Sequence, residues 1–110
     1  MTTDNRREHQ RVQISLEGQL RSAIETKYTR MLMANLSLGG AYIRTEHPLD
    51  KGQHVELTFT VNGREVSIDG EVVWVRQGDA DAGMGIRFLH IDFDDIDAMR
   101  ALIETETGSS

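Results

Sequence analysis

The sequence has no cysteine among its 110 residues. This absence excludes disulfide bonds, thiolate catalysis and zinc sites with cysteine ligands, and it fits a reducing compartment. Long apolar runs are also missing, since no stretch approaches the roughly 18 residues of a membrane span. The first residues, MTTDNRREHQ, have no signal-peptide core. We therefore expect a cytoplasmic protein without membrane insertion.

Positive charge and aromatic side chains are both scarce. Lys and Arg number 12 against 18 Asp and Glu, which argues against a duplex nucleic-acid partner because phosphate binding needs a broad basic face. Aromatic residues make up 5% of the chain, which disfavours a barrel that stacks single-stranded nucleic acid. The hydrophobic fraction of 38% allows one buried core. We expect a single domain over residues 6–107, with a flexible N-terminus at 1–5 and a frayed tail at 108–110.

Alternation of apolar and polar residues predicts a chain made mostly of strands. Val55, Leu57 and Phe59, for example, share one face of a strand. Asn62 and Gly63 predict a type I′ hairpin after it, because both residues tolerate a positive φ. The expected strands cover about residues 12–20, 27–36, 40–44, 54–61, 64–76 and 84–91.

The stretch EVVWVR is apolar on both faces, which suits the wall of a small barrel or sandwich. Strict alternation places Val72 and Trp74 on one side of this strand. Val73 and Val75 then face the other side. The outer face of such a strand must be covered by another element.

A C-terminal helix is the expected cover. Asp92 is a suitable N-cap, Asp94 and Asp95 favour the positive end of the helix dipole, and Gly108 closes the helix. The apolar stripe of this helix consists of Ile96, Met99, Leu102 and Ile103. The sequence thus predicts an all-β fold with a C-terminal helix, built from six antiparallel strands.

Catalytic and metal-binding patterns are weak throughout. The four histidines, at positions 9, 47, 54 and 90, lack the spacing of a zinc helix. Ser37 has no G-x-S-x-G context, and the aspartates at 92–97 lack the order of a calcium loop. The sequence therefore predicts neither an enzyme nor a metal site, and no cofactor.

Two segments stand apart from this background. NRREHQR, residues 5–11, places three arginines and a histidine together in an acidic chain. In ANLSLGGAYI, residues 34–43, Asn35 and Ser37 project to the same side of a strand. Gly39 and Gly40 then permit a sharp bend or the close approach of a ligand. Alone, the second segment reads as an ordinary turn with side chains bonded to their own backbone.

Together, the two segments resemble the signature of the PilZ domain, a family of bacterial receptors for the second messenger cyclic di-GMP. The signature is R-x-x-x-R, here Arg7 to Arg11, followed by [D/N]-x-S-x-x-G, here Asn35 to Gly40. The resemblance covers about residues 6–105. It implies a six-stranded antiparallel barrel with a C-terminal helix, in agreement with the pattern of strands.

The resemblance also implies roles for these residues. Arg7 and Arg11 would hold guanine edges and phosphates from a flexible arm, since arginine binds both with paired donors. Asn35 and Ser37 would offer hydrogen bonds to a guanine, with the glycine pair at 39–40 leaving room for the base. The family often has Asp at the first motif position; Asn brings no charge, which predicts lower affinity.

Four further positions extend this set. An arginine just before R-x-x-x-R is associated in the family with two mutually intercalated ligand molecules, and Arg6 occupies that place. Trp74 either stacks on a guanine or packs in the core under the helix. Arg76 and Arg87 either add positive charge to the rim of the site or remain solvated.

The resulting hypothesis is a stand-alone, non-catalytic receptor that binds cyclic di-GMP as an intercalated pair. Ordering of the arginine arm would then signal to an unidentified downstream protein. Two alternatives are a PilZ-like protein adaptor that binds no nucleotide and, less favoured, a small barrel that binds single-stranded nucleic acid.

Overall fold

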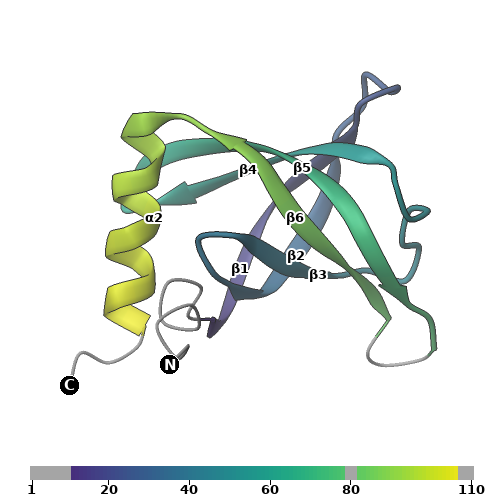
Figure 1. Cartoon of the computed structure of the whole chain (residues 1–110), viewed down its shortest axis with the longest axis horizontal. Coiled ribbons are helices and arrows are strands. Elements are labelled where there is room, and N and C mark those ends of the chain that lie inside the picture. The colour runs from purple at the N-terminus through teal and green to yellow at the C-terminus, as the bar shows by residue number, and fades with distance from the viewer. Residues whose placement is uncertain (1–10, 79–81, 107–110) are drawn as a thin grey trace, which may run out of the picture.

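The computed structural model describes residues 11–78 and 82–106, which form a closed antiparallel barrel and one helix. The elements are β1 (Val12–Ser22), β2 (Thr29–Leu36), β3 (Gly40–Arg44), β4 (His54–Val61), β5 (Arg64–Arg76), β6 (Gly83–Ile91) and α2 (Phe93–Glu106). Figure 1 shows the strands wrapping around one core, with α2 beside one end of the barrel. The predicted fold class is confirmed, and the strand bounds differ from the expected ones by at most two residues.

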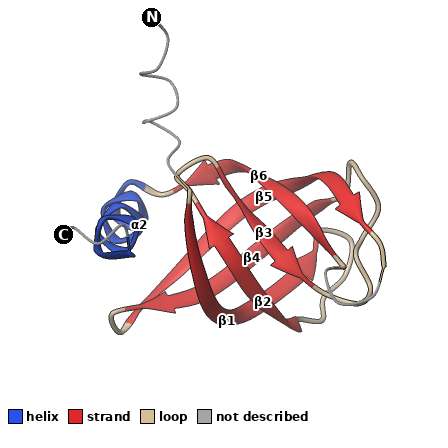
Figure 2. Ribbon diagram, turned by 90° about the horizontal axis from the view of Figure 1, so that it is seen from below, coloured by secondary structure: helices blue, strands red, loops and turns tan. Residues whose placement is uncertain are grey.

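The order of the strands around the barrel is β1-β2-β3-β6-β5-β4. The first three strands form a meander, and β4 returns to pair with β1 (Figure 2). The barrel closes where β3 pairs with β6, which places Gly40 opposite Arg87. This closure brings the turn after Asn35 next to β6, a strand that is distant from it in the chain.

The hairpin between β4 and β5 has the predicted geometry. Asn62 has φ 51° and Gly63 has φ 82°, the positive values that a type I′ turn requires at both central residues. The two strands pair without a bulge over their whole common length, from Val61 opposite Arg64 to His54 opposite Glu71.

Apolar side chains from every strand fill the barrel, and α2 completes the core. The helix inserts Met99 and Ile103, two residues of its predicted stripe, against this core. Its first turn is fixed by Asp95, which accepts a hydrogen bond from Arg64 Nε at 3.2 Å. The side chains with no measurable exposure include Met33, Leu36, Ile43, Leu57, Val66, Val72 and Met99. No helix within the described ranges is long and apolar enough to cross a membrane.

The prediction that Val72 and Trp74 share one face is wrong. The register between β5 and β6 shifts between these two residues, so a bulge interrupts the alternation of the strand. Val72 is fully buried, whereas Trp74 is 43% exposed on the outside of the barrel. Val75 turns back to pack against the core. The helix contacts the hairpin end of β5 and does not cover Trp74.

Candidate ligand-binding site

The turn between β2 and β3 is organised by the side chain of Ser37. Its hydroxyl oxygen accepts hydrogen bonds from the backbone N–H groups of Gly39 at 3.1 Å and Gly40 at 3.2 Å. The hydroxyl also donates to Gly40 O at 3.4 Å. A hydroxyl has one donor and two acceptor positions, so the turn uses all three. Ser37 is buried and shapes the site; its direct contact with a ligand stays a prediction.

Gly40 lets β3 and β6 approach closely. A Cβ atom on Gly40 would lie 2.4 Å from the carbonyl oxygen of Ile86, so any side chain there would force the strands apart. Gly39 O accepts a hydrogen bond from Phe88 N at 2.9 Å, which ties the turn to β6. Gly40 is thus needed for strand pairing, whether or not a base also uses the space beside it.

Arg11 contacts Asn35, which joins the two motifs of the sequence. Arg11 Nη1 donates to Asn35 Oδ1 at 2.7 Å, across a separation of 24 residues. The contact forms because Asn35 lies on β2 opposite the first residues of β1. Arg6 and Arg7 lie outside the described residues, so their predicted positions are not tested.

Trp74 lies flat on the outer surface of the barrel over β6. Its ring stacks on Tyr42, with centroids 5.2 Å apart and an interplanar angle of 15°. The guanidinium carbon of Arg76 lies 5.8 Å from the Trp74 centroid and 5.9 Å from the Tyr42 centroid. Trp74 is therefore a half-exposed ring on the surface, and it does not pack in the core under the helix.

Arg87 forms an ion pair next to the turn. Its Nη2 lies 2.6 Å from Glu71 Oε1, between cross-strand neighbours on β6 and β5. The Arg87 side chain is 60% exposed and the Glu71 side chain 26%. The arginine therefore keeps donors directed to solvent while one of them is held by a carboxylate.

Two open hollows flank the aromatic pair. The first has a volume of about 510 Å³, and the second, on the side of Asn35, has about 480 Å³. The first is lined by Arg11, Ser37, Gly39, Gly40, Ala41, Val73, Trp74, Gly85, Ile86, Arg87 and Phe88. The second is lined by Gln13, Ile14, Ala34, Asn35, Tyr42, Arg44 and Arg76. All the described residues that the sequence singled out thus meet on one side of the barrel.

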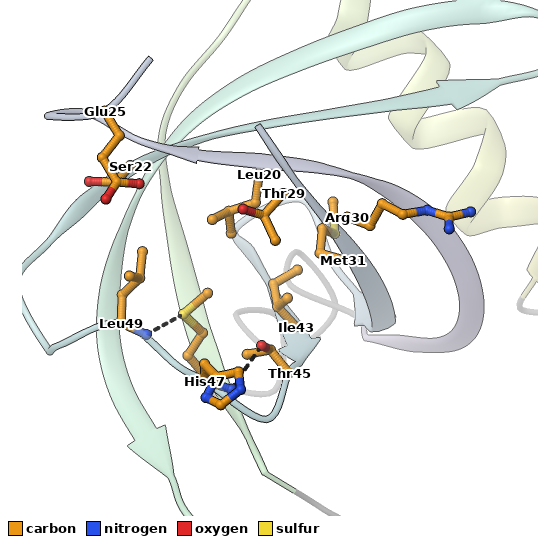
Figure 3. Close-up of a pocket in the computed structure, with 11 residues that line it drawn as sticks. Leu20, Ser22, Glu25, Thr29, Arg30, Met31, Ile43, Thr45, His47 and Leu49 are labelled. Atoms are coloured by element: carbon orange, nitrogen blue, oxygen red, sulfur yellow. Dashed lines mark hydrogen bonds between the residues drawn. The ribbon is translucent and has the colours of Figure 1, made fainter. Parts of the chain in front are cut away.

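A more enclosed cavity lies elsewhere in the barrel. It has a volume of about 180 Å³ and is lined by both apolar and polar side chains from β1, β2, β3 and β6 and from the connections after β1 and β3, most of which Figure 3 labels. It shares no residue with either motif, and its volume is less than half that of either hollow. We therefore place the candidate site at the two hollows.

Sequence reasoning missed Tyr42, Glu71 and Gly85. Gly85 makes the aromatic stack possible, because a Cβ atom there would lie only 2.2 Å from Trp74 Nε1. Two glycines separated by one residue in GMGIR were a signal that something lies close to that strand. Across residues 11–78 and 82–106, no group of three metal-ligating side chains gathers at one place.

Comparison with known proteins assigns the family. A family model described as PilZ domain matches residues 5–105, almost the whole chain. A search of curated proteins gives no match.

Three solved structures illustrate the similarity of fold. The PilZ domain of CeSA from a cellulose-synthesising bacterium has a TM-score of 0.61 at 17% identity, over 90% of this chain and 96% of that one. The PilZ domain of Escherichia coli YcgR, solved with cyclic di-GMP, has a TM-score of 0.71 at 16% identity, over 94% and 93%.

The Bacillus subtilis inhibitor of motility MotI/DgrA has a TM-score of 0.75 at 18% identity. The match covers 93% of this chain but 52% of that protein, so this chain spans about half of its length. Family model, barrel topology and the joined motifs agree, and the chain belongs to the PilZ domain family.

Proposed function

We propose that this PilZ domain is a non-catalytic receptor for cyclic di-GMP. The observation that carries the proposal is the 2.7 Å contact between Arg11 and Asn35, which joins R-x-x-x-R to [D/N]-x-S-x-x-G beside a hollow. That hollow also presents Arg87 and the half-exposed Trp74. Cations that can fork onto phosphate, next to a flat ring that can stack on a base, suit a nucleotide with two phosphates and two guanines.

Two solved PilZ structures support the same ligand. The PilZ domain of E. coli YcgR was solved with cyclic di-GMP, and PlzA of Borreliella burgdorferi was solved in complex with it. PlzA has a TM-score of 0.58 at 17% identity, and this chain covers 36% of its length. We infer that this chain binds the same ligand because the arginine and asparagine motifs are both complete in its sequence.

The finer mechanism is part of the proposal. Arg6, Arg7 and Arg11 would close over an intercalated pair of ligand molecules, and their ordering would change the surface that a downstream protein reads. Ordering five residues costs about 5–10 kcal/mol, which the contacts must offset before any affinity remains. Affinity in the micromolar range is therefore expected.

Isothermal titration with cyclic di-GMP tests the proposal. Wild-type protein should give saturable heat, with a stoichiometry near two if Arg6 has its proposed role, and the double variant Arg7→Ala, Arg11→Ala should give none. A matched control is Arg30→Ala, Arg100→Ala, which removes two exposed arginines outside both hollows. Absence of heat with folded wild-type protein would instead favour an adaptor that binds protein and no nucleotide.

A further inference from the structure

The Arg11 contact fixes the orientation of the Asn35 side chain. A guanidinium has five N–H donors and no acceptor, so the amide must turn its oxygen toward it. Asn35 Oδ1 accepts the 2.7 Å hydrogen bond from Arg11. The other end of the amide, Nδ2 with its two N–H donors, therefore points away from Arg11. Asn35 lines the second hollow, so these donors lie at the surface where a base would approach.

The charged groups around both hollows are donors as well. Arg11 and Arg87 line the first hollow, and Arg44 and Arg76 line the second. Among the described residues, no carboxylate lines either hollow. The indole N–H of Trp74 is also a donor, and the Ser37 hydroxyl is fully used by its own turn. The side-chain acceptors near the site are Glu71, which pairs with Arg87 beside the first hollow, and the Gln13 and Tyr42 oxygens in the second, so donors outnumber acceptors there.

A surface rich in hydrogen-bond donors recognises the O6 and N7 edge of guanine and not the edge that carries N1–H and the 2-amino group. Guanine presents two neighbouring acceptors, O6 and N7, to donors such as arginine or an amide N–H. Its N1–H and 2-amino groups are donors, and only an acceptor recognises them. Adenine places a 6-amino donor where guanine has O6. A donor that meets the base at O6 therefore prefers guanine to adenine but gains nothing from the 2-amino group.

We propose that Asn35, with its oxygen held by Arg11, is the residue that sets this specificity. It donates from Nδ2 to a purine acceptor, so the site recognises a 6-oxo purine and is indifferent to the 2-amino group. The inference rests on the proposed function. A carboxylate at position 35 would supply the missing acceptor, and recognition of N1–H and the 2-amino group would return.

Titration with three cyclic dinucleotides tests the inference. The probes are cyclic di-GMP, cyclic di-AMP, and cyclic di-IMP, in which hypoxanthine lacks only the 2-amino group of guanine. For wild-type protein we expect cyclic di-IMP to bind within about fivefold of cyclic di-GMP, and cyclic di-AMP to bind more than about tenfold more weakly. For Asn35→Asp we expect cyclic di-GMP to be favoured over cyclic di-IMP by more than about fivefold.

The matched control is Asn62→Asp, the same substitution in the β4–β5 hairpin outside both hollows, which should keep the wild-type preference. A loss of more than fivefold for cyclic di-IMP in the wild type would overturn the inference and leave the receptor function intact. Cyclic di-AMP within tenfold of cyclic di-GMP would overturn it too, as would an unchanged preference in Asn35→Asp. Absence of heat with all three ligands would contradict the proposed function, and this inference would fail with it.

Discussion

Trp74 stacks on Tyr42 across an intervening strand, with ring centroids 5.2 Å apart. The two residues belong to β5 and β3, and β6 lies between them in the barrel. Tyr42 and Trp74 are both aligned with Gly85 in the strand pairings. Because Gly85 has no side chain, the two rings meet above it and form a flat patch beside both hollows.

Replacement of Gly85 by alanine should push Trp74 off this surface. The new Cβ would lie 2.2 Å from Trp74 Nε1 and 2.4 Å from Cε2, a contact that only a shift of the ring can relieve. We expect a loss of about 1–3 kcal/mol in the free energy of unfolding, typical of overpacking, and a red shift of tryptophan emission as the ring becomes more exposed. Urea denaturation and fluorescence measure both.

The double variant Gly85→Ala, Trp74→Ala provides the control for that experiment. With the indole removed, the clash disappears, so Gly85→Ala should cost less in this background than alone. Emission of Gly85→Ala identical to that of the wild type would contradict the packing of Trp74 on Gly85.

The exposed face of Trp74 should contribute stacking energy to ligand binding. Base stacking on an aromatic ring is worth about 1–3 kcal/mol, so Trp74→Ala should weaken cyclic di-GMP binding by about fivefold to 150-fold. Trp74→Phe keeps an aromatic ring and should lose less. Equal affinity of the alanine variant and the wild type in isothermal titration would exclude Trp74 from the ligand contacts.

The fold was predictable because its signals are local. Strands such as 54–61 follow from alternation within a few residues, and the β4–β5 hairpin follows from Asn62 and Gly63. The bulge between Val72 and Trp74 was missed because Val73, the residue between them, is apolar and suits either face of a strand. Alternation alone therefore misplaced Trp74.

The motif residues were predictable as a set, but their partners were not. Asn35 and Arg11 stand out in the sequence. The position of Glu71 at the site, by contrast, follows only from its pairing with Arg87 on the next strand. Tyr42 likewise meets Trp74 only because β6 carries a glycine between them. Such contacts depend on the register of strands distant in sequence, which periodicity does not determine.

A second polar cluster should make stability depend on acid pH. Glu56 Oε1 accepts hydrogen bonds from Arg21 Nη2 at 2.9 Å and from the Tyr28 hydroxyl at 2.8 Å, linking β4 to β1 and its hairpin. The hydrogen bond from Arg21, and then that from Tyr28, lowers the pKa of Glu56 below its usual value despite some burial. A carboxylate with a pKa lower in the folded than in the unfolded chain stabilises the fold above the unfolded pKa.

That contribution is lost as the pH falls through the folded pKa of Glu56. Glu56→Gln should therefore destabilise the protein at about pH 7 and by progressively less as the pH falls into the acid range, measured as urea midpoints. The control Glu46→Gln removes an exposed carboxylate in the loop after β3 and should leave the pH profile unchanged. A loss in Glu56→Gln that does not change with pH would show that Glu56 contributes packing and not charge.

The ion pair of Glu71 with Arg87 should weaken binding of an anionic ligand. Glu71 Oε1 lies 2.6 Å from Arg87 Nη2, and Arg87 lines the hollow that also contains Arg11. A phosphate that binds Arg87 must share or displace this carboxylate and meets its negative charge. Glu71→Gln keeps the size and an acceptor oxygen but removes the charge.

Because a partly exposed pair of this kind is worth about 1 kcal/mol, Glu71→Gln should bind cyclic di-GMP about threefold to tenfold more tightly, with a smaller gain at high salt. Glu65→Gln, on the same strand but outside both hollows, changes the net charge equally and should alter the affinity by less than about twofold. A weaker Glu71→Gln complex would show instead that Glu71 positions Arg87 for the ligand. An equal gain in both variants would assign the effect to net charge and not to the pair.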